Sequence, residues 1–457
     1  MSGYAVTDPA TGRVVEEFGT ITDEALEDAL ATSAAGQAEW ASRGFAERAE
    51  IVGRVAALFA EKADELAEII GVEMGKRTSE GVEEAEFSRD IFGYYADHAE
   101  QLCSDLPLDA NPGGAAVVER RPIGVILGIM PWNFPYYQVA RFAAPNLMLG
   151  NAVIVKHAQI CPRSSAAIAA IMTEAGVPDG VYTNVYASHD QIETLIADPR
   201  IAGVSLTGSE RAGRQVAAQA GANLKKAVLE LGGSDPYIVL DTDDVAGAAQ
   251  QAWETRMYNV GQVCNANKRL IVAADIYDEF VAELEKLAAA ATPGDHTATD
   301  PTVYTPMSSR GAAETLAAQL EEAVAAGASL RVGGQLAETG AYVSPAVLTD
   351  IPVGSEVYYQ ELFGPVACVF KVSSDAEAVE LANNTQYGLG ASVWSTDLER
   401  AKKVGAQLQA GMVQVNSADG EGAQIPFGGV KNSGYGRELG PVGMDEFANK
   451  RLYYVGE

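Results

Sequence analysis

The chain has 457 residues, of which 47% are hydrophobic and 21% are charged, a balance typical of a globular protein. Its 62 acidic and 32 basic residues give a formal net charge of −30, which argues against a nucleic-acid partner. One hydrophobic core rarely supports a chain of this length, so we expect two or three domains.

Neither a membrane segment nor a secretory signal is evident. The sequence contains no run of 18 apolar residues, and residues 1–9 lack the basic and apolar regions of a signal peptide. We therefore expect a cytoplasmic protein with no membrane partner. The cysteines and histidines are scattered and show neither C-x-x-C pairs nor zinc-ligand spacing, so we expect no disulfide framework and no metal site: Cys103, Cys161, Cys264, Cys368, His98, His157, His189 and His296.

The strong negative charge has its own physical consequence. Self-repulsion weakens a compact state unless salt screens it. The acidic residues are dispersed along presumed helix faces, as in residues 22–28 and 80–86. We interpret this pattern as adaptation to high internal salt, and an ordinary acidic cytosolic protein is the alternative.

The first part of the chain is predicted to be helical. Residues 20–102 contain apolar residues at helical spacing, and Thr22 is placed to cap the first helix. Residues 106–120 then form two extended pieces around an Asn-Pro-Gly-Gly turn. This stretch predicts a hairpin that projects from the body.

From Gly124 onward, short apolar strands alternate with helices, which is the pattern of a parallel, doubly wound sheet. Ligands of such sheets bind where strands end and helices begin. Helices are expected to start near Pro135, Pro162, His189 and Ser209. The predicted strands are residues 125–129, 152–156, 182–186, 203–206 and 227–231.

A second set of alternating elements follows Pro236 and extends through residues 413–416. The tail, residues 451–455, is predicted to be a strand without a local partner. It is expected to pair with the projecting hairpin or with another subunit. The other predicted elements are a strand at 237–240, a helix at 245–257, a strand at 269–273, a helix at 277–290 and a loop at 291–310.

Cys264 is the candidate nucleophile. It lies in a short loop between Gly261 and the basic pair Lys268-Arg269, and such a loop allows a substrate to approach the sulfur. A lone cysteine is more often a small buried hydrophobic residue. Glu230 favours the catalytic interpretation, because a carboxylate among apolar residues and glycines is an expensive choice for structure alone.

Several motifs in order resemble the NAD(P)-dependent aldehyde dehydrogenase superfamily over roughly residues 5–455. Within that superfamily the chain is most similar to the short succinate-semialdehyde dehydrogenases, through residues 156–158, 231–236 and 261–264. The motifs are Pro-Trp-Asn-Phe-Pro at 131–135, Gly-Asn-Ala-Val-Ile-Val-Lys at 150–156, Thr-Gly-Ser at 207–209 with Gly213, Glu-Leu-Gly-Gly at 230–233, Gly-Gln-Val-Cys at 261–264, Glu-x-Phe-Gly-Pro at 361–365 and Pro-Phe-Gly-Gly at 426–429.

The resemblance implies an α/β fold with two doubly wound parallel-sheet domains, a Rossmann-like cofactor domain and a catalytic domain, plus a small β oligomerisation element. The NAD(P)-binding domain is expected at residues 1–104 and 121–232, and the catalytic domain at 233–440. Residues 105–120 and 441–457 are expected to form the oligomerisation element of a homodimer or homotetramer.

The same resemblance implies the catalytic roles. Cys264 would attack the aldehyde, and the Asn133 side-chain amide and the Cys264 backbone N–H would hold the resulting oxyanion. Glu230 would act as the general base that activates water to hydrolyse the thioester. Its presence favours release of a free acid over transfer to coenzyme A.

The cofactor is expected to be NAD or NADP, although no G-x-G-x-x-G motif occurs at the expected strand–helix turn. Gln159 stands where strongly NAD-preferring relatives have glutamate, and a neutral amide does not repel a 2′-phosphate. The residues that the resemblance implies for cofactor binding are Trp132, Lys156, Gln159, Gly208, Ser209, Glu361 and Phe363.

The substrate is expected to be a small aldehyde, with succinate semialdehyde as the first choice. Arg141 matches an arginine that succinate-semialdehyde dehydrogenases use for the substrate carboxylate, and lies eight residues after Asn133. A second arginine of those enzymes is replaced here by Tyr258, with Arg256 two residues earlier. The alternative for Arg141 is that it merely pairs with a surface acid.

Other functions stay open at this point. The aldehyde could be 2-oxoglutarate semialdehyde, betaine aldehyde or a hydroxyaldehyde. A catalytically silent binding protein of the same fold is a further alternative, although the joint presence of Cys264, Glu230 and Asn133 argues against it. A phosphatase or kinase is disfavoured because the sequence has no P-loop and no metal–carboxylate cluster.

Overall fold

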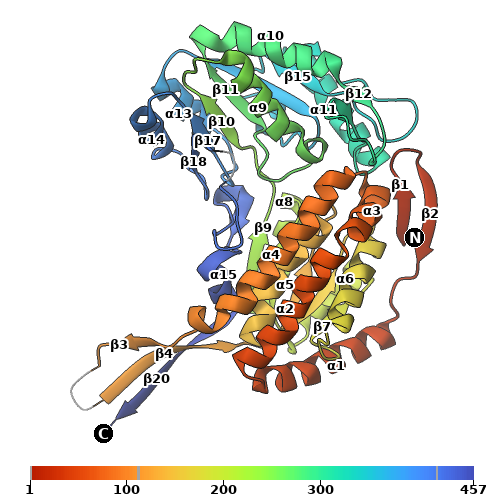
Figure 1. Cartoon of the computed structure of the whole chain (residues 1–457), viewed down its shortest axis with the longest axis vertical. Helices are drawn as coiled ribbons and strands as arrows, with labels where there is room; N and C mark the ends of the chain where they lie inside the picture. The colour runs from red at the N-terminus through yellow and green to blue at the C-terminus, as the bar shows by residue number, and fades with distance from the viewer. Residues whose placement is uncertain (1–2, 111–113, 418–419, 457) are drawn as a thin grey trace.

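The computed structural model describes residues 3–110, 114–417 and 420–456. Its two largest sheets are each covered by helices, and an arm of three strands extends away from them (Figure 1). None of the helices in these ranges is long and apolar enough to cross a membrane. The chain begins with an antiparallel hairpin and four helices: β1 (Tyr4–Asp8), β2 (Arg13–Phe18), α1 (Asp23–Ser42), α2 (Phe45–Glu61), α3 (Ala63–Met74) and α4 (Thr78–Leu102).

The first sheet has the strand order β19-β9-β8-β5-β6-β7, and its strands are parallel except β19. Alternate residues of one strand are buried on opposite faces. Thus Ile126 packs with helices α2, α4, α5 and α6, whereas Val125 and Leu127 pack with α1, α7 and α8. Its elements are β5 (Val125–Ile129), α5 (Pro135–Leu149), β6 (Ala152–Lys156), α6 (Pro162–Glu174), β7 (Tyr182–Asn184), α7 (His189–Ala197), β8 (Ile201–Thr207), α8 (Glu210–Ala222), β9 (Lys226–Glu230) and β19 (Gly434–Tyr435).

Buried carboxylates fix the starts of α5 and α6, which both begin at the carboxyl edge of this sheet. Glu84 of α4 accepts hydrogen bonds from the backbone N–H groups of Tyr136 (2.8 Å) and Tyr137 (3.1 Å), and Lys76 pairs with the same carboxylate. Glu73 of α3 accepts in the same way from the first turn of α6. These carboxylates satisfy N–H groups that have no partner within the helix and lie at its positive end.

The second sheet has the order β14-β15-β16-β11-β10-β17-β18, with β14 antiparallel to the others. Its helices also cover both faces, because Ile238 and Tyr237 of one strand belong to different core clusters. Its elements are β10 (Pro236–Val239), α9 (Val245–Met257), the 3-10 turn η1 (Tyr258–Gly261), β11 (Arg269–Ala273), α10 (Ala274–Ala290), β12 (Thr292–Pro293), β13 (Val303–Tyr304), α11 (Arg310–Ala326), β14 (Ser329–Val332), β15 (Ala346–Thr349), α12 (Glu356–Tyr359), β16 (Val366–Val372), α13 (Asp375–Asn383), β17 (Ser392–Trp394), α14 (Leu398–Gly405), β18 (Gln414–Val415) and the 3-10 turn η2 (Lys431–Ser433).

The arm is a three-stranded antiparallel sheet made of β3 (Leu106–Leu108), β4 (Gly114–Pro122) and β20 (Ala448–Gly456), which follows α15 (Gly440–Glu446) (Figure 1). β20 pairs with β4 of the same chain over its whole length. The predicted hairpin is therefore present, while most of its Asn-Pro-Gly-Gly turn lies outside the described residues. The tail strand is also longer than residues 451–455.

The predicted α/β class and both parallel sheets are confirmed. One strand departs from the predicted domain ranges. β19 lies within 233–440, the range predicted for the catalytic domain, yet it pairs with β9 of the first sheet. Gly434 makes this possible, because its φ is +115° and a Cβ there would lie 1.9 Å from the Leu229 carbonyl oxygen. The other domain limits stay predictions.

Candidate active site

Cys264 borders a cavity of about 640 Å³, and part of its surface is open to this space. The cavity is walled by α4, the start of α5, α9 and the cysteine loop. Aromatic side chains of Phe134, Tyr137 and Tyr258 form much of its surface. Its size suits a small organic molecule.

The loop that carries Cys264 is reached through an unusual backbone. Asn259, Val260 and Gly261 have φ values of +48°, +54° and +73°. This left-handed conformation is strained for a β-branched residue such as Val260. A Cβ on Gly261 would lie 2.3 Å from the Gly364 carbonyl oxygen, so the motif requires glycine there.

Arg256 holds this strained segment in place. Its side chain is fully buried and donates to the carbonyl oxygens of Gly261 (3.0 Å), Leu362 (2.9 Å), Gly364 (2.6 Å) and Val366 (2.8 Å). Neither Arg256 nor any of these four acceptor residues lines the cavity. Arg256 is therefore a structural cation of the loop and offers nothing to a substrate in this cavity.

Asn133 lies against the cysteine loop, immediately before α5. Its side-chain Nδ2 donates to the Gln262 carbonyl oxygen (3.1 Å), and its own carbonyl oxygen accepts from Asn259 Nδ2 (3.0 Å). The backbone just after Asn133 is fixed by the hydrogen bonds that Tyr136 and Tyr137 donate to Glu84. The structure therefore places the Asn133 side chain against the cysteine loop, two residues before Cys264. Its role as an oxyanion donor stays a prediction.

Glu230 is 2% exposed, and neither carboxylate oxygen has a hydrogen-bond partner among the described residues. Burial raises its pKa well above the ordinary value; Glu438 raises it further, while Arg141 and Arg437 lower it. Gly428 of the Pro-Phe-Gly-Gly motif makes room for this side chain, since a Cβ there would lie 2.5 Å from Glu230 Oε1. An unsatisfied buried carboxylate is a sign of function.

The Cys264 thiol is in an environment that disfavours its charged form. Burial raises its pKa to about 12, although the cations Arg141 and Lys268 act in the opposite direction. Glu361 and Asp235 add to the increase. The free enzyme therefore holds a thiol at neutral pH, and nucleophilic attack requires its deprotonation.

The two residues predicted to contact substrate differ in position. Tyr258 lines the cavity, and its hydroxyl donates to Glu83 (3.0 Å). Arg141 is fully buried and does not line the cavity; it pairs with Glu438 and donates to Gln138 Oε1 (2.8 Å). Its guanidinium also lies 4.1 Å from the centre of the Phe427 ring. Arg141 is therefore paired with an acid, as the alternative holds, but that acid is the buried Glu438 rather than a surface residue. This pairing disfavours a carboxylate clamp.

The predicted cofactor residues lie along the carboxyl edge of the first sheet and the facing loop. β5, β6 and β8 are neighbours, so Lys156 at the end of β6 and Gly208 after β8 lie at the same edge. Ser209 caps α8, and a Cβ on Gly208 would meet open space. Gln159 follows β6, and its carbonyl oxygen accepts from the Ala5 N–H (3.1 Å). Such an edge is where doubly wound sheets bind nucleotides.

Lys156 offers a direct test of whether this edge fits a dinucleotide. The residue is 7% exposed, and its Nζ has no hydrogen bond or ion pair with any residue in the described ranges. Burial lowers its pKa to about 8. The Nζ lies 5.7 Å from the centre of the Tyr4 ring, and this contact leaves its hydrogens free to donate. Such a buried lysine fits the hydroxyls or the 2′-phosphate of a cofactor ribose.

The remaining predicted cofactor contacts form one group. The Trp132 and Phe363 rings meet edge to face with centroids 5.8 Å apart. Glu361 Oε1 accepts from the Gly233 N–H (3.0 Å) and pairs with Lys268 Nζ (2.9 Å). A Cβ on Gly232 would lie 2.2 Å from Glu361 Oε2, which explains the glycines after Glu230. The group therefore joins the cofactor edge to the cysteine loop.

The polar character of the cavity differs from the expectation for an anionic substrate. Five carboxylate residues line it, and no arginine, lysine or histidine does so among the residues that the structure describes. The carboxylates are Glu83, Glu84, Asp235, Glu254 and Glu421. A substrate carboxylate would find no cation on these walls.

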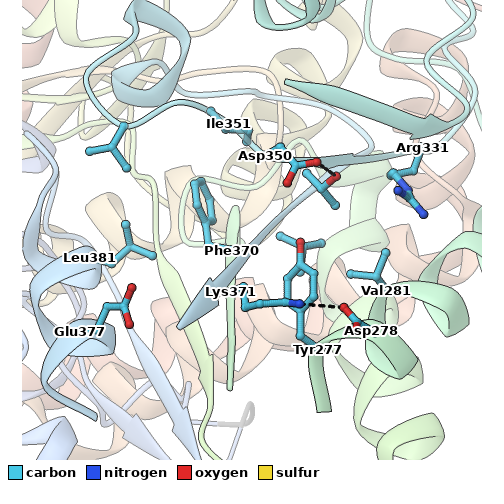
Figure 2. A pocket seen from close by; sticks show the side chains of 13 residues that line it. Tyr277, Asp278, Val281, Arg331, Asp350, Ile351, Phe370, Lys371, Glu377 and Leu381 are labelled. Atoms are coloured by element: carbon cyan, nitrogen blue, oxygen red, sulfur yellow. Dashed lines mark hydrogen bonds and ion pairs between the residues drawn. The ribbon is translucent and has the colours of Figure 1, made fainter. Parts of the chain in front are cut away.

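A second hollow, of about 620 Å³, is lined by residues of the second sheet and its helices and does not include Cys264 (Figure 2). Tyr277, Phe370 and Ile351 give it apolar surface, and Lys371 pairs with Asp278 at its side (2.8 Å). None of the residues predicted for catalysis or cofactor binding lines it. The cavity beside Cys264 is therefore the one that matches the predicted chemistry.

Comparison with known proteins agrees with this site. Residues 2–452 match the model of the aldehyde dehydrogenase family. The chain belongs to the aldehyde dehydrogenase family. Among curated relatives, the succinate-semialdehyde dehydrogenase [NADP(+)] of Deinococcus radiodurans is 46% identical over 451 residues, covering 98% of this chain and 94% of that protein. Succinate-semialdehyde dehydrogenase [NADP(+)] 1 of Mycobacterium tuberculosis is 41% identical and covers 99% of both chains.

Solved aldehyde dehydrogenases share the fold closely. The succinic semialdehyde dehydrogenase of Streptococcus pyogenes, crystallised with NADP+, aligns with a TM-score of 0.96 at 40% identity, covering 99% of this chain and 100% of that one. The Burkholderia pseudomallei succinate-semialdehyde dehydrogenase aligns with a TM-score of 0.95 at 33% identity, covering 100% and 95%. The predicted family and the predicted similarity to succinate-semialdehyde dehydrogenases are thus confirmed.

Sequence reasoning missed the structural role of the buried residues that hold the cysteine loop of this aldehyde dehydrogenase site. Arg256, Asn259 and Lys268 are buried and hold the loop around Cys264 through backbone carbonyl groups or Asn133. A signal was present for Lys268, because a lysine directly after the cysteine loop and before an apolar strand is placed to be buried. The roles of the predicted site residues remain proposals.

Proposed function

We propose that this chain oxidises a small aldehyde to its carboxylic acid with NADP+ as the cofactor, and that succinate semialdehyde is the substrate. The observation that supports the activity is the state of the three predicted catalytic residues. Cys264 borders the cavity, Asn133 lies against its loop, and Glu230 is buried without a hydrogen-bond partner.

In the first step, the Cys264 thiolate would attack the carbonyl carbon, forming a C–S bond while the carbonyl π electrons move to oxygen. The Asn133 Nδ2–H and the Cys264 backbone N–H are the donors for that oxyanion. The Asn133 Nδ2 carries two hydrogens, of which one donates to the Gln262 carbonyl oxygen and the second is left for the oxyanion. The bound cofactor supplies the acceptor for the hydride that leaves the carbon.

In the second step, Glu230 would remove a proton from the water that attacks the thioester, and the C–S bond breaks to return the thiolate. The raised pKa suits this role, because the base must hold the proton taken from water. Hydrolysis yields the free acid.

Lys156, Gln159, Gly208 and Ser209 would hold the cofactor at the carboxyl edge of the first sheet. The buried Lys156, which forms no ion pair among the described residues, and the neutral Gln159 permit a 2′-phosphate. The names of the relatives at 41–46% identity support NADP+. Measuring the dissociation constants of NAD+ and NADP+ separately tests this choice.

Succinate semialdehyde is supported by the same relatives. The walls of the cavity favour a second candidate substrate, a neutral small aldehyde. Among the described residues, five carboxylates and no cation line this cavity. Steady-state kcat/KM for succinate semialdehyde and for butanal, measured with NADP+ in high salt, decides between them. A preference for butanal would overturn the assignment of succinate semialdehyde and retain the oxidation of aldehydes.

The setting of this activity is also proposed. The arm carries exposed apolar residues, among them Leu106, Leu452, Tyr453 and Val455, each more than half exposed. We expect this surface to be covered in a cytoplasmic homodimer or homotetramer. Light scattering that shows a monomer at micromolar concentration and high salt would contradict this expectation.

A further inference from the structure

Lys268 is a buried cation directly behind the nucleophile. The residue is 2% exposed and follows the cysteine loop at the start of β11. Its Nζ donates to the carbonyl oxygens of Val263 (2.7 Å) and Cys264 (2.6 Å), and pairs with Glu361 Oε1 (2.9 Å). One ammonium group thus touches both the cysteine loop and a predicted cofactor contact.

The contact with Val263 has a geometric consequence for the oxyanion hole. The Val263 carbonyl and the Cys264 N–H belong to one trans peptide, so they point in opposite directions. Holding the carbonyl on Lys268 therefore fixes the direction of the Cys264 N–H. The nearby positive charge also polarises this peptide and strengthens the N–H as a donor.

The contact with Glu361 connects the same group to the cofactor side. Glu361 Oε1 is held between Lys268 and the Gly233 N–H, in the segment that follows Glu230. Asp235 is also near, since Lys268 lowers its pKa against the effect of burial. The cation therefore stands between two carboxylates and the nucleophile loop.

We propose that Lys268 is a positioning residue that aims the Cys264 N–H at the oxyanion and holds Glu361 for the cofactor, which links the two halves of the site. This inference rests on the proposed dehydrogenase activity. It assigns a role to a residue that contacts neither the aldehyde nor the cavity.

The test compares Lys268→Met, which removes the charge and the donors, with Lys268→Arg, which keeps both. Lys286→Met is the matched control, because Lys286 is an exposed lysine of α10 paired only with Glu283. For Lys268→Met we expect kcat to fall about tenfold to a hundredfold, as for a weakened oxyanion donor, with little change in the KM of the aldehyde. Lys268→Arg should recover most of this loss, and the control should match the wild type.

Two readouts do not depend on turnover. Alkylation of Cys264 by iodoacetamide without cofactor should be several-fold slower in Lys268→Met at each pH, because a cation that favours the thiolate is gone. The other charges around this thiol are Arg141, Glu361 and Asp235. NADP+ should also bind more weakly to Lys268→Met, whereas Asn133→Ala should lower kcat and leave NADP+ binding unchanged.

The outcomes separate the two proposals. A wild type that oxidises no aldehyde contradicts the proposed function, while the alkylation and binding readouts still test Lys268. An active wild type with Lys268→Met equal to it in kcat, alkylation and NADP+ binding overturns the positioning role. Equal losses in Lys268→Met and Lys268→Arg, with normal alkylation in both, show that the side chain only fills space.

Discussion

Arg141 and Glu438 form an ion pair whose side chains are almost completely buried, although 297 residues separate them in the chain. Removing one partner of such a pair leaves the other charge buried and alone, which costs about 3–5 kcal/mol. We therefore expect Arg141→Met to lower the free energy of unfolding by that amount and to reduce activity on succinate semialdehyde and butanal alike. Urea unfolding and the two kcat/KM values measure this.

The carboxylate-clamp hypothesis predicts a different result for the same variant. A lost clamp would raise the KM of succinate semialdehyde about tenfold, which corresponds to about 1.4 kcal/mol, and leave butanal unaffected. That selective effect, with unchanged stability, would show that Arg141 reaches the substrate despite its pairing with Glu438. Arg214→Met serves as the control, because its ion pair with Glu210 is on the surface.

Replacing the nucleophile should separate chemistry from binding. Cys264→Ala removes the sulfur but none of the predicted cofactor contacts, so we expect dehydrogenase activity to disappear and NADP+ to bind as in the wild type. Activity assays and titration of NADP+ by fluorescence measure the two properties. Turnover near that of the wild type would remove Cys264 from the mechanism.

Glu230→Gln should slow the hydrolytic half of the reaction more than the oxidative half. The amide cannot accept a proton from water, so the thioester should accumulate and a burst of reduced cofactor should precede slow turnover. Rapid-mixing absorbance measurements detect this burst. If the burst vanishes together with the steady-state rate, Glu230 acts before the thioester forms.

The pH dependence of thiol reactivity follows from the raised pKa of Cys264, about 12. Below that pKa the thiolate fraction rises tenfold for each pH unit, so iodoacetamide labelling of the free enzyme should rise steadily from pH 7 to 10. Cys264→Ala defines the background from Cys103, Cys161 and Cys368, which are buried. A plateau of the rate below pH 8 would mean that the thiol is already ionised near neutrality.

The net charge of −30 leads to a prediction about salt. Screening shortens the range of repulsion from about 30 Å at 0.01 M salt to about 3 Å at 1 M. We expect the enzyme to lose secondary structure and activity when it is dialysed below about 0.1 M salt. Circular dichroism during the dialysis tests this, and an unchanged spectrum with full activity would identify an ordinary acidic protein.

Much of the fold was predictable because local patterns determine it. Helices begin at Pro135, Pro162 and His189, as expected. Proline favours the first helical position in the first two, and the Ser188 side chain caps the third. The central strands of both sheets, such as β5, β6, β10 and β11, are almost wholly buried, and continuous apolar runs identify them. The alternation of such strands with helices then restricts the topology.

The contacts that decide the site could not be derived in this way. Helical spacing places Arg141 two turns after Asn133, but the partner that its guanidinium meets is Glu438 from a distant segment. The direction of Lys268 depends on the left-handed turn at Asn259 and Val260, which is adopted against local preference. β19 joins the first sheet because of one glycine, Gly434, whose importance appears only in three dimensions.

The pairing of β20 with β4 has a consequence for the order in which the chain can fold. β4 ends at Pro122, whereas its partner β20 spans Ala448–Gly456, far later in the chain. During synthesis the edge of β4 that binds β20 therefore stays without a partner, and so does the edge of β9 that binds β19. Such edges can pair with other chains before the proper strand emerges. Completion of the arm is thus a late event in biogenesis, and deleting β20 would leave every newly made molecule with the open edge that normally exists only on the nascent chain.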